Sequence, residues 1–177
     1  FRYRIARPAP TLYGQFKNLK NIDGILRGLI RMGFDDVFDV ARGADVVTRA
    51  VSERLKRPDA PHPLISSACP AVVRLIQVRF PDLIPHIVDV RQPMEVAAMI
   101  ARTEFCKKHN CEPADVGVFF ITPCAAKMTA VKSPVGQEKS YVDGVIAIKD
   151  VYAQMRAAMK QGFSPLEIDR ASVVGIK

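Results

Sequence analysis

The amino-acid sequence predicts an α/β protein with a mainly parallel β-sheet flanked by helices. Short apolar segments typical of buried strands alternate along the chain with segments whose apolar residues recur at helical spacing. The expected strands are apolar on both faces, as they are when helices cover both sides of a parallel sheet. At 177 residues the chain can bury one sizeable core, so we expect residues 1–177 to form a single α/β domain.

Each expected strand is a short apolar segment next to a turn or helix signal. The segment 116–122 is the clearest, since it contains branched and aromatic residues, no charge, and a proline near each end. We expect a sheet of about four or five strands with helices on both faces. The expected strands, in chain order, are 2–7, 37–40, 64–67, 116–122 and 142–148, and 173–177 resembles the start of another.

The expected helices have apolar residues at helical spacing between recognisable end signals. Asn21 is an expected N-cap and Gly33 an expected C-terminal stop for the first helix. Pro70 and Pro93 each begin a helix, because proline is favoured at the first helical position. The expected helices cover 22–32, 44–55, 70–80, 93–108 and 151–160.

Composition and charge exclude several classes of function. The net charge is +8, but Lys and Arg are scattered and not interleaved with aromatic residues, so we expect no nucleic-acid partner. No apolar run reaches about 18 residues and no signal peptide is visible, so we expect no membrane partner and a cytoplasmic location. We find no phosphate-binding loop, dinucleotide fingerprint or hydrolase triad.

Two cysteines occupy equivalent places in the expected fold. Cys69 follows the expected strand 64–67 and Cys124 follows 116–122, and each lies beside a proline where a helix begins. Because the carboxyl ends of parallel strands meet at one edge of a sheet, the two thiolates should face one crevice and could share one metal centre. Backbone N–H groups at a helix start stabilise thiolates. Soft thiolate ligands in such surroundings are typical of iron–sulfur sites.

The other two cysteines, Cys106 and Cys111, lie in a charged stretch at the end of the expected helix 93–108. Their separation of five residues predicts that they point from different faces. We interpret them as partly buried or surface thiols rather than ligands. A cubane needs about four protein ligands, so we expect the remaining ligands beyond Lys177. Two thiolates would hold a cubane weakly, and the isolated chain should therefore be largely free of metal.

Both cysteine segments resemble signatures of the iron-only (FeFe) hydrogenase large subunit. Ser66–Pro70 is similar to the family's Thr-Ser-Cys-Cys-Pro, and Thr122–Lys127 is similar to its Met-Pro-Cys-Thr-Ala-Lys-Lys. Further similar segments occur in the family's order, namely Ala9–Thr11, Gly33–Asp39, Gln92–Met94 and Tyr141–Val145. The resemblance covers nearly the whole chain and implies a fragment of the catalytic domain of such a hydrogenase.

The resemblance assigns roles to individual residues. Cys69 and Cys124 would be two of the four thiolates of a 4Fe–4S cluster. Lys127 would reach the anionic cyanide ligands of an attached diiron centre, as a compact point charge can. The remaining implied cofactor-binding residues line the same pocket: Ala9, Pro10, Thr11, Met94 and Pro123.

The departures from the family pattern concern proton transfer. Active members carry a second cysteine, a proton donor, at the position of Ala68, and alanine has no proton to transfer. We therefore expect no catalytic residue in this fragment. Other carriers of the family's proton path are also replaced, at Ala50 or Val51, Arg54 and Val88. The third cysteine signature is absent from the chain.

This pattern resembles the sensory hydrogenases, in which slow or absent turnover accompanies a signalling role. The implied partners are the remainder of the same polypeptide, with the third cysteine signature and ferredoxin-like and PAS modules, and a ferredoxin-like electron-transfer partner. One alternative is a hydrogenase-like iron–sulfur protein without a diiron centre, as in the eukaryotic assembly and prelamin-binding relatives. Another is an α/β interaction domain with inert cysteines, since free cysteine often serves as a small hydrophobe.

Overall fold

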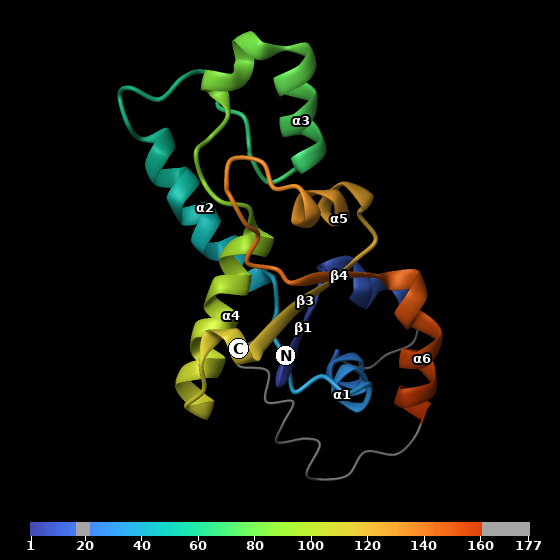
Figure 1. The fold of residues 1–177 in the computed structure, drawn as a ribbon. Coiled ribbons are helices and arrows are strands. Elements are labelled where there is room, and N and C mark those ends of the chain that lie inside the picture. The colour runs from blue at the N-terminus through green and yellow to red at the C-terminus, as the bar shows by residue number, and fades with distance from the viewer. Residues whose placement is uncertain (17–21, 161–177) are drawn as a thin grey trace.

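A computed structural model describes residues 1–16 and 22–160 of the chain. Its centre is a four-stranded sheet with the order β2-β1-β3-β4, in which every neighbouring pair is parallel (Figure 1). The strands are β1 (Tyr3–Pro8), β2 (Asp36–Val37), β3 (Val116–Thr122) and β4 (Gly144–Ala147). The predicted α/β fold with a parallel sheet is confirmed.

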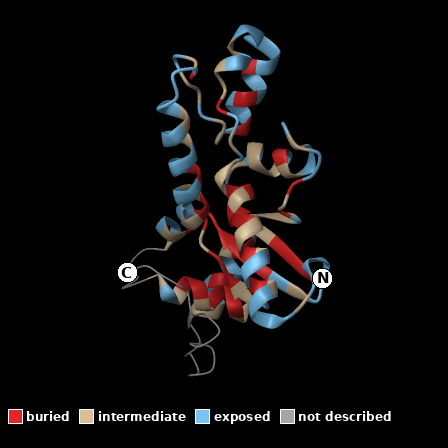
Figure 2. Ribbon diagram, turned by 90° about the vertical axis from the view of Figure 1, so that its left-hand side faces the viewer, coloured by how far each residue is buried: buried red, intermediate tan, exposed pale blue. Residues whose placement is uncertain are grey.

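The two central strands, β1 and β3, pair over six residues, from Tyr3 opposite Val116 to Pro8 opposite Ile121. All but one of the residues of β3 are buried, which explains why the segment is apolar on both faces. Side chains alternate between two cores: Val118 and Phe120 face one of them, and Ile121 faces the other. Figure 2 shows the buried residues concentrated around this sheet.

Helices cover both faces, as expected. On one face, α1 (Asp23–Arg31) packs against α6 (Ile148–Lys160), with Leu29 and Met155 fully buried. On the other face, α4 (Pro93–His109) covers β3 and α2 (Ala41–Leu55) packs against α4. The two helices α2 and α4 lie so close together at Gly43 that the Cβ of any larger residue there would be 2.4 Å from the Cβ of Ala97.

Beyond the carboxyl end of the sheet lie two short helices, α3 (Pro70–Arg79) and α5 (Ala125–Lys132), which contact each other (Figure 1). The Arg74 guanidinium joins them by donating to the carbonyl oxygen of Ser133 at 2.9 Å and to its hydroxyl at 3.1 Å. Three 3-10 turns complete the described chain: η1 (Pro10–Gln15), η2 (Pro81–His86) and η3 (Pro113–Asp115).

One predicted strand is wrong. Residues 64–67 do not join the sheet, and Ile65 forms only an isolated parallel bridge with Ile87. Its backbone N–H bonds to the carbonyl of His86, its carbonyl accepts from Val88, and the Ser67 hydroxyl donates to the carbonyl of Val90 at 2.6 Å. The segment therefore satisfies its polar groups against residues 86–90 instead of against a sheet strand.

The remaining element predictions are confirmed with small changes in length. The expected strand 37–40 is observed instead as the two residues Asp36–Val37, and 142–148 shortens to Gly144–Ala147. Gly33 follows the end of α1 with a positive φ of 97°. The predicted N-cap Asn21 and the segment 173–177 lie outside the described residues. No helix in the described ranges is long and apolar enough to cross a membrane.

Candidate metal centre beyond the carboxyl end of the sheet

Cys69 and Cys124 both occupy the N-cap position of a helix, α3 and α5 respectively. Their backbone is extended, with φ/ψ of −105°/105° and −88°/107°, and within the described chain neither side chain caps its own helix. The first-turn N–H groups of a helix have no partner inside the helix and carry partial positive charge. Each cysteine thus lies at the start of a helix, beside N–H groups that have no partner inside that helix.

The segments that precede the two cysteines differ in structure. Cys124 follows β3 directly, as predicted, whereas Cys69 follows the segment 64–67, which is not in the sheet. The contact between α3 and α5 brings the two helices together instead. Cys69 is exposed and Cys124 is half-buried.

Lys127 and Arg7 both lie within cation–π distance of the Phe120 ring. The Lys127 Nζ lies 5.9 Å from the centre of the Phe120 ring, and the Arg7 Cζ lies 6.0 Å from it. Both are cation–π distances. Arg7 also donates from Nη1 to the backbone carbonyl of Met94. Two cations, one from β1 and one from α5, therefore lie within cation–π distance of the same ring, and Arg7 also contacts Met94.

Arg7 was not among the predicted site residues. Its side chain is fully buried, and in the described residues its Nε and Nη2 atoms have no hydrogen-bond partner. Burial lowers its pKa to about 9, against the opposing attraction of Glu95 and Asp39. A guanidinium with unpartnered buried donors is costly unless an anion satisfies them. The signal was available in the sequence, as a charged residue inside the otherwise apolar segment ending β1.

Glu95, which was not predicted either, holds the start of α4 in place. Its buried carboxylate accepts from the Ser140 hydroxyl and from the Tyr141 N–H, both at 2.7 Å. The Ser140 hydroxyl oxygen in turn accepts from the N–H of Val142 at 3.0 Å. This network fixes Met94, the preceding residue, against the sheet. A cavity of about 220 Å³ beside it is lined by Ser67, Met94 and Glu95 among others, but by neither Cys69 nor Cys124.

The other predicted pocket residues divide by burial. Ala9 and Met94 are buried, and the Ala9 N–H donates to the carbonyl of Ile121 at 2.8 Å, which fixes the chain next to the end of β3. Pro10, Thr11 and Pro123 are exposed, so in this structure they form a surface rather than an enclosed wall.

Cys106 and Cys111 belong to a different part of the molecule. Cys111 precedes β3 and Cys124 follows it, and the seven residues of that strand span about 20 Å. Cys106 likewise lies on α4 twelve residues beyond Met94, or about 18 Å along the helix. These separations place Cys106 at the far end of α4 from Met94 and Cys111 at the opposite end of β3 from Cys124, and their interpretation as non-ligands stays a prediction.

The donor set fits part of an iron–sulfur site. Cys69 and Cys124 supply soft sulfur donors at two helix starts, and Lys127 supplies positive charge in the first turn of α5, the helix that Cys124 begins. A cubane has about four protein ligands. In the described part of the chain, no group of three or more metal-ligating side chains of His, Cys, Asp or Glu lies together.

Comparisons with known proteins agree with this fold. A family model described as the iron-only hydrogenase large subunit, C-terminal domain, matches residues 2–173. Iron hydrogenase 1 of Clostridium pasteurianum is 26% identical over 152 residues, covering 83% of this chain. The cytosolic Fe–S cluster assembly factor NAR1 of Yarrowia lipolytica is 24% identical over 149 residues, covering 79%.

A structural relative shows the same fold. The apo FeFe-hydrogenase HydA1 from Chlamydomonas reinhardtii superposes with a TM-score of 0.71 over 90% of this chain, at 22% identity. The chain spans 45% of that structure, and 26% and 30% of the Clostridium and Yarrowia proteins. Because the family model covers almost the whole sequence, the chain belongs to the family formed by the C-terminal domains of iron-only hydrogenase large subunits.

Proposed function

We propose that the chain forms part of a hydrogenase-like cluster site, with a 4Fe–4S cluster and an attached diiron centre, in a protein that senses hydrogen or redox state. The observation that carries the proposal is the pair of N-cap cysteines on the contacting helices α3 and α5. Such a group would supply the redox chemistry and the site for hydrogen. The remaining thiolates would come from outside the described residues.

The residues of this chain would hold and orient the group. The Cys69 and Cys124 thiolates would ligate iron, stabilised by the helix N–H groups behind them. Lys127 and Arg7 would neutralise the anionic ligands of the diiron centre. Met94 and Ala9 would form the dry wall that strengthens these electrostatic contacts.

Slow turnover is proposed because the chain lacks proton carriers where the family pattern has them. Ala68 has no transferable proton, and Val88, which replaces a serine of that path, is buried and apolar. A buried apolar side chain can neither donate nor accept a proton. A sensor needs only to bind and report, and does not require a fast proton path.

A second candidate function is that of an iron–sulfur protein without a diiron centre, with an assembly role. The observation that favours it is the similarity to the Yarrowia assembly factor, which is comparable in identity to that of the hydrogenase. The two candidates share Cys69 and Cys124 and differ in whether Lys127 and Arg7 face an anionic diiron centre.

Anaerobic reconstitution of the full-length protein with iron and sulfide tests the proposal. We expect four irons per chain at this site, lost in Cys69→Ser and Cys124→Ser and retained in the matched controls Cys106→Ser and Cys111→Ser. Equal iron in all four variants would contradict the assignment of the ligands. After maturation, carbonyl and cyanide infrared bands would support the diiron centre, and iron without those bands would favour the second candidate.

A further inference from the structure

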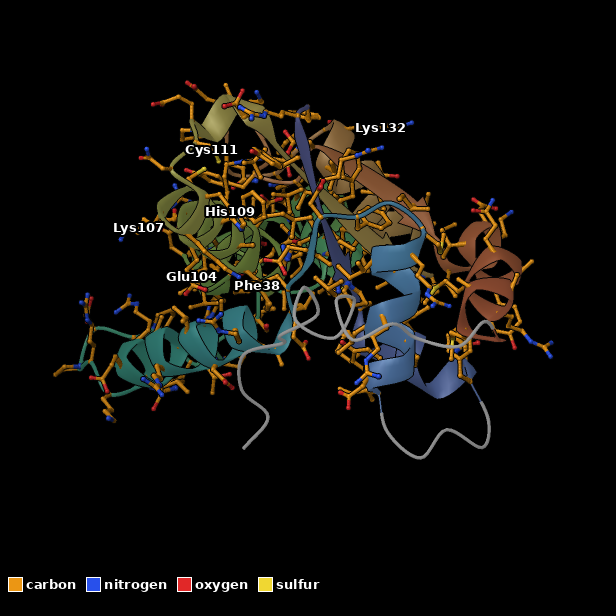
Figure 3. All side chains as sticks on the ribbon, turned by 90° about the horizontal axis from the view of Figure 1, so that it is seen from below. Phe38, Glu104, Lys107, His109, Cys111 and Lys132 are labelled. Carbon is orange, nitrogen blue, oxygen red and sulfur yellow. The ribbon has the colours of Figure 1, made fainter. Side chains whose placement is uncertain are left out.

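Cys106 and Cys111 form a second pair of thiols at the end of the molecule remote from Cys69 and Cys124. Cys106 lies in the last turn of α4, and Cys111 lies two residues beyond the end of that helix, ahead of β3. Figure 3 shows Cys111 near His109 at this end of α4. The five-residue separation predicted side chains on different faces, and the structure shows that this prediction is wrong.

The reversal is caused by the backbone of Asn110. Asn110 has φ/ψ of 48°/53°, the left-handed conformation that ends many helices. The N–H of Asn110 and the N–H of Cys111 both donate to the carbonyl of Cys106, the latter at 3.2 Å. The bond from the Cys111 N–H to the Cys106 carbonyl is the 6→1 bond of a Schellman motif, and side chains at these two positions frequently come into contact.

The two thiols are in mutual contact and partly accessible. Both are half-buried and pack against the same core. Burial and a hydrogen bond with the Cys111 thiol raise the pKa of Cys106, while Arg102 lowers it. One backbone hydrogen bond joins the same two residues, so their Cα atoms are held close, as a disulfide requires (about 4.4–6.8 Å).

We propose that Cys106 and Cys111 are a reversible redox-modification site, which low-molecular-weight disulfides such as glutathione disulfide close into an intramolecular disulfide. The Cys111 thiolate attacks one sulfur of the external disulfide and releases the first small thiolate. The Cys106 thiolate then attacks the Cys111 sulfur of the mixed disulfide and releases the second. The protein loses two protons and two electrons, and the external disulfide is reduced to two thiols.

The first attack is assigned to Cys111 because the raised pKa of Cys106 lowers the thiolate fraction of that residue. The second step needs no large movement, since the Schellman motif already brings the two side chains together. The bond would tie the end of α4 to the connection leading into β3. This site is independent of the proposed cluster, which lies at the other end of β3.

Peptide mapping after oxidation tests the proposal. The full chain is incubated anaerobically with glutathione disulfide, free thiols are blocked, and the protein is cleaved with trypsin and with a protease that cuts before aspartate. Cleavage after Arg102, Lys107 and Lys108 and before Asp115 separates peptide 103–107 from 109–114 and leaves Cys124 on 115–127. We expect 103–107 linked to 109–114, with a mass loss of two hydrogens that dithiothreitol reverses.

Two variants of Asn110 test whether disulfide formation depends on the left-handed turn or is non-specific oxidation of two partly accessible thiols. Asn110→Gly keeps the left-handed turn and should close at the wild-type rate, whereas Asn110→Val disfavours it and should close at least about tenfold more slowly. In Cys106→Ser, Cys111 should stop at the glutathione mixed disulfide. Separate glutathione adducts on both wild-type cysteines, a link to Cys69 or Cys124, or equal rates in both Asn110 variants would overturn the proposal.

Discussion

The guanidinium of Arg7, near the end of β1, donates a hydrogen bond from Nη1 to the backbone carbonyl of Met94, the second residue of α4. This contact ties the sheet to the helix start that carries Glu95. It uses one of the donors of Arg7 and leaves Nε and Nη2 without a partner in the described chain. Buried guanidinium donors without a partner are costly for stability, so this arrangement is typical of an arginine that binds an anion.

Replacing Arg7 with methionine tests this interpretation. Removing one member of a buried ion pair is costly, whereas replacing buried charges that lack close partners by apolar side chains is often neutral or stabilising. In the described residues the only hydrogen bond of the Arg7 side chain goes to the Met94 carbonyl, so Arg7→Met leaves no hydrogen-bonded carboxylate unpaired. We therefore expect Arg7→Met to leave the free energy of unfolding of the cluster-free chain within about 1 kcal/mol, or to raise it, in urea titrations. Arg7→Ala is the control and should lose about 2–4 kcal/mol through its cavity. An equally large loss in Arg7→Met would mean that the guanidinium is a structural partner of Glu95.

Glu95→Gln should destabilise the start of α4. The amide can accept the Ser140 hydrogen bond through oxygen, but its NH₂ group would face the Tyr141 N–H, leaving two donors opposed. We expect a loss of about 1–3 kcal/mol in urea unfolding. Glu53→Gln is the matched control, because Glu53 is exposed and its ion pair with Lys56 is worth little. Equal effects of both substitutions would contradict the proposed network.

Gly43→Ala should be destabilising although alanine is the better helix former. Its Cβ would lie 2.4 Å from the Ala97 Cβ and 2.6 Å from the Pro93 carbonyl oxygen, so α2 and α4 must separate. Overpacking of this kind costs about 1–3 kcal/mol. Gly14→Ala, where nothing lies within 4 Å, should change the melting temperature little. A stabilised Gly43→Ala would show that the helices can move apart without loss.

Asp36→Asn should stabilise the protein at neutral pH. Burial raises the pKa of Asp36 above 3.8, and its Oδ1 accepts the Val37 N–H at 2.8 Å, which an asparagine oxygen can also do. As pH rises, Asp36 loses its proton at a lower pH in the unfolded state than in the folded state. Ionisation of Asp36 therefore favours unfolding above about pH 3.8. Urea unfolding at several pH values should show an advantage of the variant at pH 7 that disappears below about pH 4. An advantage independent of pH would refute the electrostatic cause.

Ala68→Cys restores a proton donor beside the proposed cluster. In the full, cluster-loaded protein we expect hydrogen turnover to rise by at least about tenfold, below the 10²–10⁴-fold typical of a complete general-acid path because other carriers remain replaced. Ala68→Ser is the control, since its weakly acidic hydroxyl should give a smaller gain. Wild-type rates already equal to those of a bulk hydrogenase would contradict the sensory proposal.

Local patterns in the sequence predicted most of the fold. The strand 116–122 was assigned with its observed bounds because it is apolar on both faces, and Pro70 and Pro93 marked helix starts because proline fits the first turn. The pairing of Cys69 and Cys124 was inferred from a sheet edge. In the structure the helices that these cysteines begin contact each other, which no local pattern encodes, and the shared metal centre stays a prediction.

The amino-acid sequence alone determined the α/β class, the family motifs and the helix positions of both proposed ligands, because these depend on neighbouring residues and short periodicities. Tertiary structure decided that residues 64–67 pair with residues 86–90, that Arg7 is buried beside Met94, and that Cys106 and Cys111 meet. The first two features depend on which distant groups form hydrogen bonds with buried polar atoms. The third depends on the left-handed backbone of Asn110. The hydrophobic pattern of the sequence predicts none of the three.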